Sequence, residues 1–184
     1  MQINDYEATK PITTDAVATE TTGGTMNNTT KNSATNDDVI STLNNLIETC
    51  KDGQEGFKQA AEGVQRSDLK TTFYELGQQR SQFAGELQTL VRELGGDPET
   101  TSSTTGALHR GWINIKSAIT GQDDGAILNE AERGEDVAKK AYKDALALSL
   151  PSNVQTIVQR QADAVFAAHD KVRDMRDSAN AATT

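Results

Sequence analysis

The chain lacks the groups that build a cross-linked, aromatic or membrane-bound protein. Cys50 is the only cysteine among 184 residues, which excludes an intramolecular disulfide and fits a reducing compartment. Aromatic residues make up only 4% of the chain, so the core has to be built from aliphatic and small side chains. The sequence has no apolar run as long as the ~20 residues that a membrane span needs. Residues 1–16 lack the basic stretch followed by an apolar run that is typical of a signal peptide. We therefore expect a soluble, cytoplasmic protein with no membrane partner.

Positive charge is also in short supply. The chain has 18 Lys and Arg against 27 Asp and Glu, a formal net charge of -9. Phosphate backbones and anionic lipids do not attract such a surface. We therefore expect no nucleic-acid partner.

Residues with catalytic chemistry are few. The two histidines, His109 and His169, are not preceded by a glutamate three residues earlier, so the Glu-x-x-His motif of di-iron bundles is absent. The sequence also has no phosphate-binding glycine loop, no Ser-His-Asp pattern and no zinc-ligand spacing. Cys50 lies on an apolar stripe, which favours a buried thiol over a nucleophile. We therefore expect no enzymatic activity.

Composition divides the chain into three parts. Residues 1–36 are rich in Thr, Asn, Ala and Gly and cannot bury enough apolar area to offset their ordering entropy, so we predict a disordered tail. Residues 37–178 carry helical periodicity and form the predicted domain, and residues 179–184 form a predicted disordered end.

Four long segments of the domain have apolar residues at alternating steps of three and four, which predicts amphipathic helices. The segments begin at about Asn36, Ser67, Asp124 and Pro151, with N-caps expected at Asn36 and Ser67, and Gly95–Pro98 ends the second one. Short links join the first pair and the last pair, and residues 95–123 join the pairs through a short helix that Trp112 anchors. We predict an all-α, ferritin-like four-helix bundle with a long crossover between helices 2 and 3. The alternative is a short helix that only caps one end of the bundle.

Each apolar stripe is interrupted near its midpoint, at Gly53, Arg80, Gly134 and Gln161. If the first turn is centred near Arg66, Gly53 and Arg80 lie at the same height, and the missing side chain of Gly53 makes room for the guanidinium. A buried arginine needs partners. The candidates are Gln161 and the helix residues Gln54, Glu55, Glu130 and Glu135. Three interpretations stay open: a polar layer that fixes the register of the helices, an anion or small-molecule pocket, and an Arg80 side chain that reaches solvent.

A divalent-metal site is a further alternative. The crossover topology places His169 near the height of several carboxylates, and a histidine with two or three carboxylates could bind a metal. The candidates are Glu62, Glu130, Glu132, Glu135 and His169, with Glu55 less central. The competing interpretation is a solvated helix face with an ordinary His169–Asp170 pair at its rim, and no cofactor.

Four features together resemble the bacterial DUF2383 family, which is grouped with ferritin-like folds. They are the DGxxGF pattern at 52–57, the QxRxxFAxEL pattern at 78–87, HRGW at 109–112 and ERGED at 132–136. The resemblance covers roughly residues 37–178 and implies a ferritin-like bundle from a family without an established enzymatic activity. We therefore expect an interaction or stress-associated module, with a homodimer as a possible assembly and an unknown protein partner.

Overall fold

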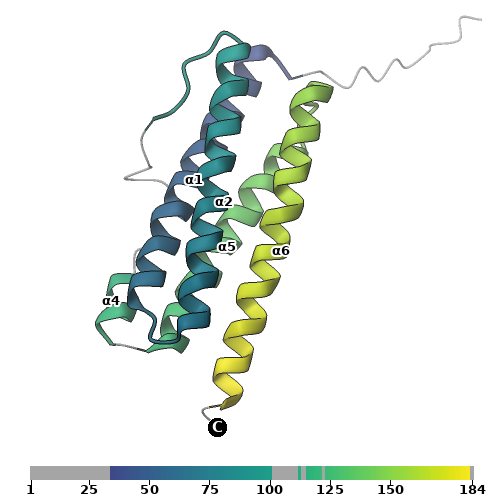
Figure 1. The fold of residues 1–184 in the computed structure, drawn as a ribbon. Helices are drawn as coiled ribbons and strands as arrows, with labels where there is room; N and C mark the ends of the chain where they lie inside the picture. The colour runs from purple at the N-terminus through teal and green to yellow at the C-terminus, as the bar shows by residue number, and fades with distance from the viewer. Residues whose placement is uncertain (1–33, 101–111, 113–114, 122, 183–184) are drawn as a thin grey trace, which may run out of the picture. The chain divides into compact units, whose positions relative to one another are not determined.

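The computed structural model describes residues 34–100, 112, 115–121 and 123–182. The long helices of these residues are α1 (Asn36–Gly63), α2 (Ser67–Glu93), α5 (Asp124–Leu146) and α6 (Ser152–Ala182), and the short α4 (Ile115–Thr120) precedes α5 (Figure 1). Residues 1–33 of the predicted disordered tail lie outside the described residues. All described residues belong to one compact unit, Lys31–Thr184.

The helices begin and end at physically recognisable signals. Thr35 caps α1 in a capping box: its hydroxyl accepts from the Asp38 amide, and the Asp38 carboxylate accepts from the Thr35 amide. Gly95 ends α2 with a φ of 77°, and the amides of Gly95 and Gly96 donate to the carbonyls of Arg92 and Val91. This pair of bonds is a Schellman motif, which needs a left-handed residue that glycine adopts without strain.

Three of the predicted boundaries are wrong. Thr35, not Asn36, caps α1, because the hydroxyl of Thr35 reaches the Asp38 amide. Ser67 is not the cap of α2; instead the Asp124 carboxylate accepts from the amides of Gln65 and Arg66 across the turn. The predicted disordered end at 179–184 is helical to Ala182, since Ala179 still packs on the lower core.

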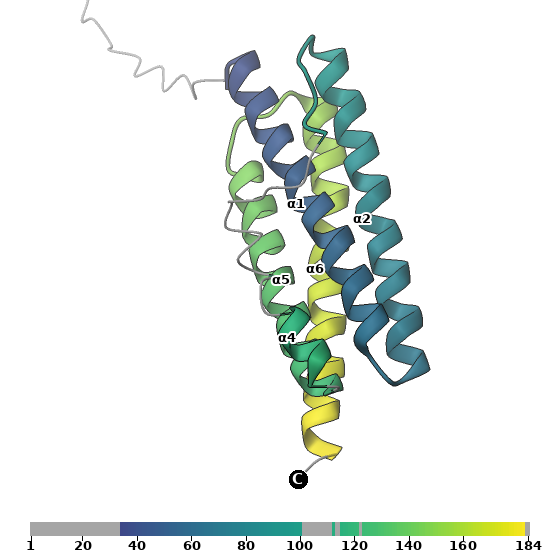
Figure 2. The same cartoon turned by 90° about the vertical axis from the view of Figure 1, so that its left-hand side faces the viewer.

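The crossover runs the full length of the bundle. At the end of α2, the Leu94 carbonyl accepts from the Asn36 side chain at the start of α1, whereas α5 begins at Asp124, beside Gln65 at the end of α1. Residues 94–123 therefore connect opposite ends of the bundle, as in ferritin-like topology. The short helix α4 lies against α1 and α5 at the end where α5 begins (Figure 2). No described helix is long and apolar enough to span a membrane.

The core consists of two apolar clusters stacked along the bundle axis. The first, called here the upper cluster, surrounds Leu43, Leu87 and Val158 near the α5–α6 link. The lower cluster surrounds Phe57, Phe73 and Ile127 near the α1–α2 turn. Each of the four long helices contributes to both clusters, so the boundary between them crosses the middle of the bundle.

Candidate functional site

A layer of polar side chains lies buried where the two apolar clusters meet. It is called here the polar layer and consists of Cys50, Arg80, Glu135, Tyr142 and Gln161, each at most 1% exposed. All four long helices contribute to it.

Arg80 forms an ion pair inside the bundle. Its Nη2 donates to Oε2 of Glu135 at 2.7 Å, and both side chains are 1% exposed. Its Nη1 donates to Gln79 Oε1 at 2.9 Å, and its guanidinium carbon lies 5.8 Å and 5.9 Å from the ring centroids of Phe57 and Phe83. Burial opposes the charge, but Glu135 raises the pKa of Arg80 above its ordinary value. The layer therefore keeps a permanent cation, and the interpretation in which Arg80 reaches solvent is wrong.

Gly53 of α1 lies against the stem of Arg80. A β-carbon built on Gly53 would lie 3.4 Å from Cγ and 3.6 Å from Cδ of Arg80, which is ordinary van der Waals contact. The glycine therefore borders the aliphatic stem, and the guanidinium extends past it to Glu135. A methyl group fits at this position, whereas a longer side chain would meet the stem.

The rest of the polar layer forms a hydrogen-bonded chain that leads to the surface. Cys50 Sγ lies 3.2 Å from the Tyr142 hydroxyl, which donates to Gln161 Oε1 at 2.9 Å. Gln161 Nε2 donates to Glu86 Oε2 at 2.6 Å, and the exposed Arg160 pairs with the same oxygen. Burial raises the pKa of the Cys50 thiol to about 11 and raises that of Tyr142 well above its ordinary value. Both groups are therefore protonated at neutral pH.

The sequence identified some members of this layer and missed others. Arg80, Gln161 and Glu135 were all named as candidates, but Tyr142 and Glu86 were not. The predicted stripe of α5 ran through Gly134, whereas the structure also buries Glu135 and Tyr142. Tyr142 is the only aromatic residue of α5, and that was a usable signal.

Glu55 is not a partner of Arg80, and its assignment to the layer was wrong. It is exposed on α1 and accepts from Gln59, four residues later on the same helix. Gln54 is also exposed. The reason is angular: residues next to Gly53 in sequence point to other sides of the helix.

The predicted metal ligands do not come together. Glu135 pairs with Arg80, Glu132 pairs with Arg176, and Glu130 pairs with Arg133 at 3.2 Å. Glu62 is exposed on α1. Within the described ranges, no group of three or more His, Cys, Asp or Glu side chains is arranged to hold a metal ion. The structure therefore does not gather Glu62, Glu130, Glu132, Glu135 and His169 into one site, and arginines of the chain pair with three of these carboxylates.

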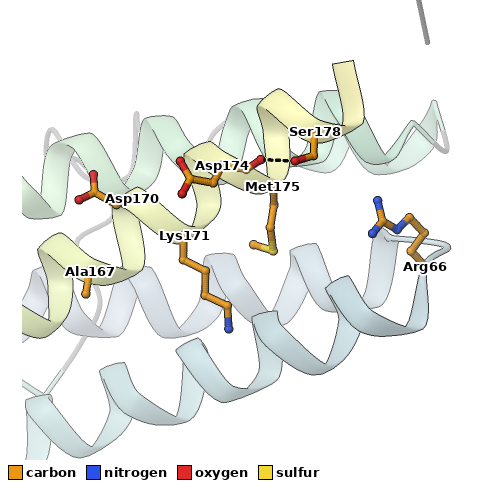
Figure 3. Close-up of a pocket in the computed structure, with 7 residues that line it drawn as sticks. All are labelled: Arg66, Ala167, Asp170, Lys171, Asp174, Met175 and Ser178. Atoms are coloured by element: carbon orange, nitrogen blue, oxygen red, sulfur yellow. Dashed lines mark hydrogen bonds between the residues drawn. The ribbon is translucent and has the colours of Figure 1, made fainter. Parts of the chain in front are cut away.

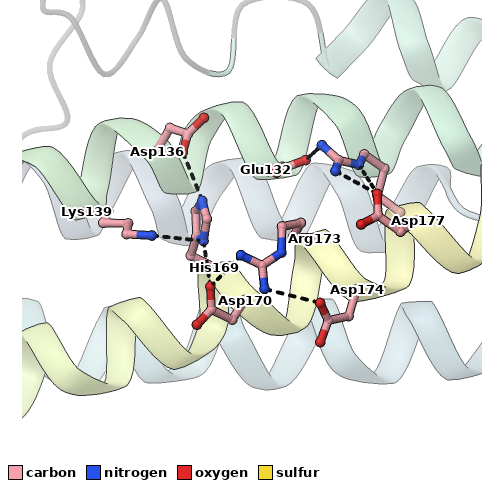
Figure 4. A network of polar contacts seen from close by, with 9 residues as sticks. Glu132, Asp136, Lys139, His169, Asp170, Arg173, Asp174 and Asp177 are labelled. Atoms are coloured by element: carbon pink, nitrogen blue, oxygen red, sulfur yellow. Dashed lines mark hydrogen bonds and ion pairs between the residues drawn. The ribbon is translucent and has the colours of Figure 1, made fainter.

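His169 joins α5 and α6 at the edge of the bundle (Figure 4). Its Nε2 lies 2.9 Å from Asp136 Oδ1, and its Nδ1 lies 3.2 Å from Asp170 Oδ1 and 3.3 Å from Lys139 Nζ. With the proton on Nε2, the ring donates to Asp136 and accepts from Lys139. The ring therefore contacts two carboxylates and one ammonium group, and its contacts with Asp136 and Lys139 connect α6 to α5.

Trp112 closes the side of the bundle between α1 and α5. It is 7% exposed, and its ring centroid lies 5.1 Å from that of Phe57 in an edge-on arrangement. A β-carbon on Gly56 would lie 2.1 Å from the indole, and one on Gly134 would lie 2.3 Å from it. These two glycines therefore provide the space for the indole. His109 and the rest of the HRGW motif before Trp112 lie outside the described residues.

A surface hollow of about 640 Å³ lies between α6 and the α1–α2 turn (Figure 3). Its lining includes charges of both signs, Arg66 and Lys171 together with Asp170 and Asp174. Arg66 is already paired with Asp68 at 2.5 Å. The hollow therefore presents no field of one sign for a charged ligand.

Comparisons with known proteins point to one family and one fold. Residues 38–148 match the sequence model of the family described as "Domain of unknown function (DUF2383)". No curated protein matches the chain. Among solved structures, the chain is similar to a two-domain protein with DJ-1/ThiJ/PfpI-like and ferritin-like domains from Anabaena variabilis, at a TM-score of 0.67 and 14% identity. The match covers 83% of this chain and 40% of that one, so the chain spans less than half the length of that protein and the likeness shows the fold alone.

Proposed function

Because the chain belongs to the DUF2383 family and folds as a ferritin-like four-helix bundle, we propose that it is a non-catalytic interaction module whose centre is closed by its own charges. The observation that carries this proposal is the Arg80–Glu135 ion pair, 2.7 Å long and 1% exposed, at the midpoint of the bundle.

The ion pair occupies the region in which metal-binding bundles hold their cations. Such centres take glutamates and Glu-x-x-His motifs that project inward from all four helices. Here the inward-facing carboxylate of Glu135 is neutralised by a guanidinium that cannot lose its proton in a protein. A second cation beside Glu135 would meet the repulsion of Arg80 in a medium of low dielectric constant.

Two side chains that often take part in catalysis, Cys50 and His169, are held by contacts within the bundle. Nucleophilic attack needs a thiolate, and burial raises the pKa of Cys50 to about 11. His169 is buried between Asp136, Lys139 and Asp170. These contacts support a structural use of both residues.

Thermal unfolding in the presence of metal tests the proposal. The tag-free, full-length chain is stripped of metal, and its Tm is measured with and without Fe(II), Mn(II) or Zn(II). We expect the same Tm throughout and no stoichiometric metal by elemental analysis of the protein as purified. A Tm that rises with metal concentration would contradict the proposal, because a ligand that binds the native state must stabilise it. Repeating a positive result with His169→Ala would show whether the predicted carboxylate–histidine set binds the metal.

A further inference from the structure

The exposed face of α2 has an uncharged stripe along most of its length. Six exposed positions at steps of three and four residues share this face, and none of them is charged, although 24% of the chain is charged. They are called here the α2 stripe: Thr71, Tyr74, Gln78, Gln82, Gly85 and Thr89. The exposed positions of α5 differ, since they include Arg133, Asp136, Lys140 and Asp144.

Two members of the α2 stripe have no explanation within the folded chain. Gly85 lies in the middle of a 27-residue helix, where glycine is a poor helix former, yet a β-carbon there would meet nothing within 4 Å. The other glycine of α2, Gly77, packs against Gln54 and Phe57 of α1. Tyr74 is 46% exposed, the highest value among the exposed large hydrophobic side chains described. A small residue and an exposed aromatic on one helix face fit close packing against another helix.

The two flanks of the α2 stripe carry opposite charges. Helical geometry places Glu75, Glu86 and Glu93 along one flank and Lys70 along the other, and Glu86 is already paired with Arg160. Arg92, eighteen residues after Tyr74, continues the line of the stripe itself at the end of α2. On the basic flank, a hollow of about 280 Å³ opens between α2 and α1, lined by Tyr74 and Ser81 of α2 and by Lys58 and Glu62 of α1, among others.

We propose that the α2 stripe is the contact between two copies of this chain, aligned in parallel about a two-fold axis. The proposal rests on the proposed function and names the partner of the interaction module. A parallel pair brings the acidic flank of one copy against the basic flank of the other, so that Glu75 of each copy faces the hollow beside Lys58 of its partner. Gly85 meets its own counterpart at the axis, where the missing side chains let the backbones approach.

The charge distribution favours a second copy over another occupant. Two chains with a net charge of -9 repel each other, so they associate only where the surface is uncharged and its edges are complementary. A two-fold contact uses the same patch on both subunits, which requires a self-complementary surface. The α2 stripe meets both conditions in the parallel alignment, whereas an antiparallel alignment would place the acidic flanks together.

Sedimentation velocity of the full-length chain, from low micromolar to sub-millimolar concentration, tests the contact. We expect a reversible dimer that Tyr74→Ala and Gly85→Gln each weaken by about tenfold or more in Kd. Both positions are exposed in the monomer, so circular dichroism should show unchanged helicity. The matched control is Leu148→Ala, which truncates the other exposed large hydrophobic residue, 41% exposed, and should leave the dimer unchanged.

Charge reversal tests the alignment. Lys58→Glu and Glu75→Lys should each weaken the dimer, and the double variant should restore it, because the parallel pair puts these residues opposite each other. A monomer at every concentration would overturn the proposal, and so would a dimer that Tyr74→Ala and Gly85→Gln leave unchanged. A dimer in which the double reversal fails to restore association would overturn the parallel alignment. None of these results affects the metal titration above, so the two proposals fail separately.

Discussion

At the scale of single residues, two buried groups of the polar layer keep their protons because the bundle excludes water from them. The thiol of Cys50 and the hydroxyl of Tyr142 lie in contact at 3.2 Å, and burial raises both pKa values. Only the neutral forms of these groups are compatible with the folded state near neutral pH. Because the folded chain holds these protons more tightly than the unfolded chain does, the free energy of unfolding should fall as the pH becomes alkaline.

We predict that the free energy of unfolding falls between pH 9 and 11. The unfolded chain loses the Cys50 proton near 9.0, whereas the folded chain holds it to about 11, so the folded state binds more protons in this window. At about 1.4 kcal/mol per pH unit, the total loss from Cys50 is about 3 kcal/mol. Urea unfolding followed by circular dichroism at a series of pH values measures it. Cys50→Ala should lose this part of the slope, and an equal slope in that variant would contradict the assignment to the thiol.

At the scale of elements, periodicity and helix-ending signals predicted most of the architecture. The four long helices, the Gly95 stop, the short helix of the crossover and the ferritin-like order follow from patterns local to each segment. The boundaries that failed depend on partners distant in sequence, such as the Asp124 carboxylate that binds the amides of the α1–α2 turn.

Gly53 and Gly56 of α1 make room for different side chains, and the sequence could not tell which partner each one has. Gly53 borders the Arg80 stem, as the turn register suggested, but the partner of Gly56 is Trp112, which comes from the crossover 56 residues later. A regular helix can be registered against its neighbour by counting residues from the turn, whereas a long connection cannot.

We predict that Gly56→Ala is destabilising and that Gly53→Ala is not. The new methyl at position 56 would lie 2.1 Å from the indole and force Trp112 to move, at a cost of about 1–3 kcal/mol. The methyl at position 53 fits at contact distance, so the change should be neutral or gain up to about 1 kcal/mol in helix propensity. Urea unfolding measures both, and tryptophan emission should shift only in Gly56→Ala. Equal effects at the two positions would contradict the placement of Trp112.

At the scale of the whole molecule, two apolar clusters are held in register by one polar layer. The sequence showed that all four helices interrupt their stripes near the middle. In the structure Gly53 lies against Arg80, whereas Gly134 lies against Trp112 and Gln161 bonds Tyr142 and Glu86. The sequence did not show which carboxylate pairs with Arg80, because a rotation of α5 by one residue would exchange the directions in which Gly134 and Glu135 point. That rotation depends on the packing of all the helices together, and of Trp112 against Gly134 in particular.

The central claim is that Arg80 and Glu135 form a closed structural pair, and a double-mutant cycle tests it most directly. Arg80→Met and Glu135→Leu each leave a buried charge unpaired, which should cost about 3–5 kcal/mol in the free energy of unfolding. The double variant replaces the pair with apolar groups and should be at least as stable as the wild type, within about 1 kcal/mol. Urea unfolding, followed by the fluorescence of the single tryptophan, gives all four values. Recovery of stability in the double variant is the predicted result, and losses that simply add would contradict the account.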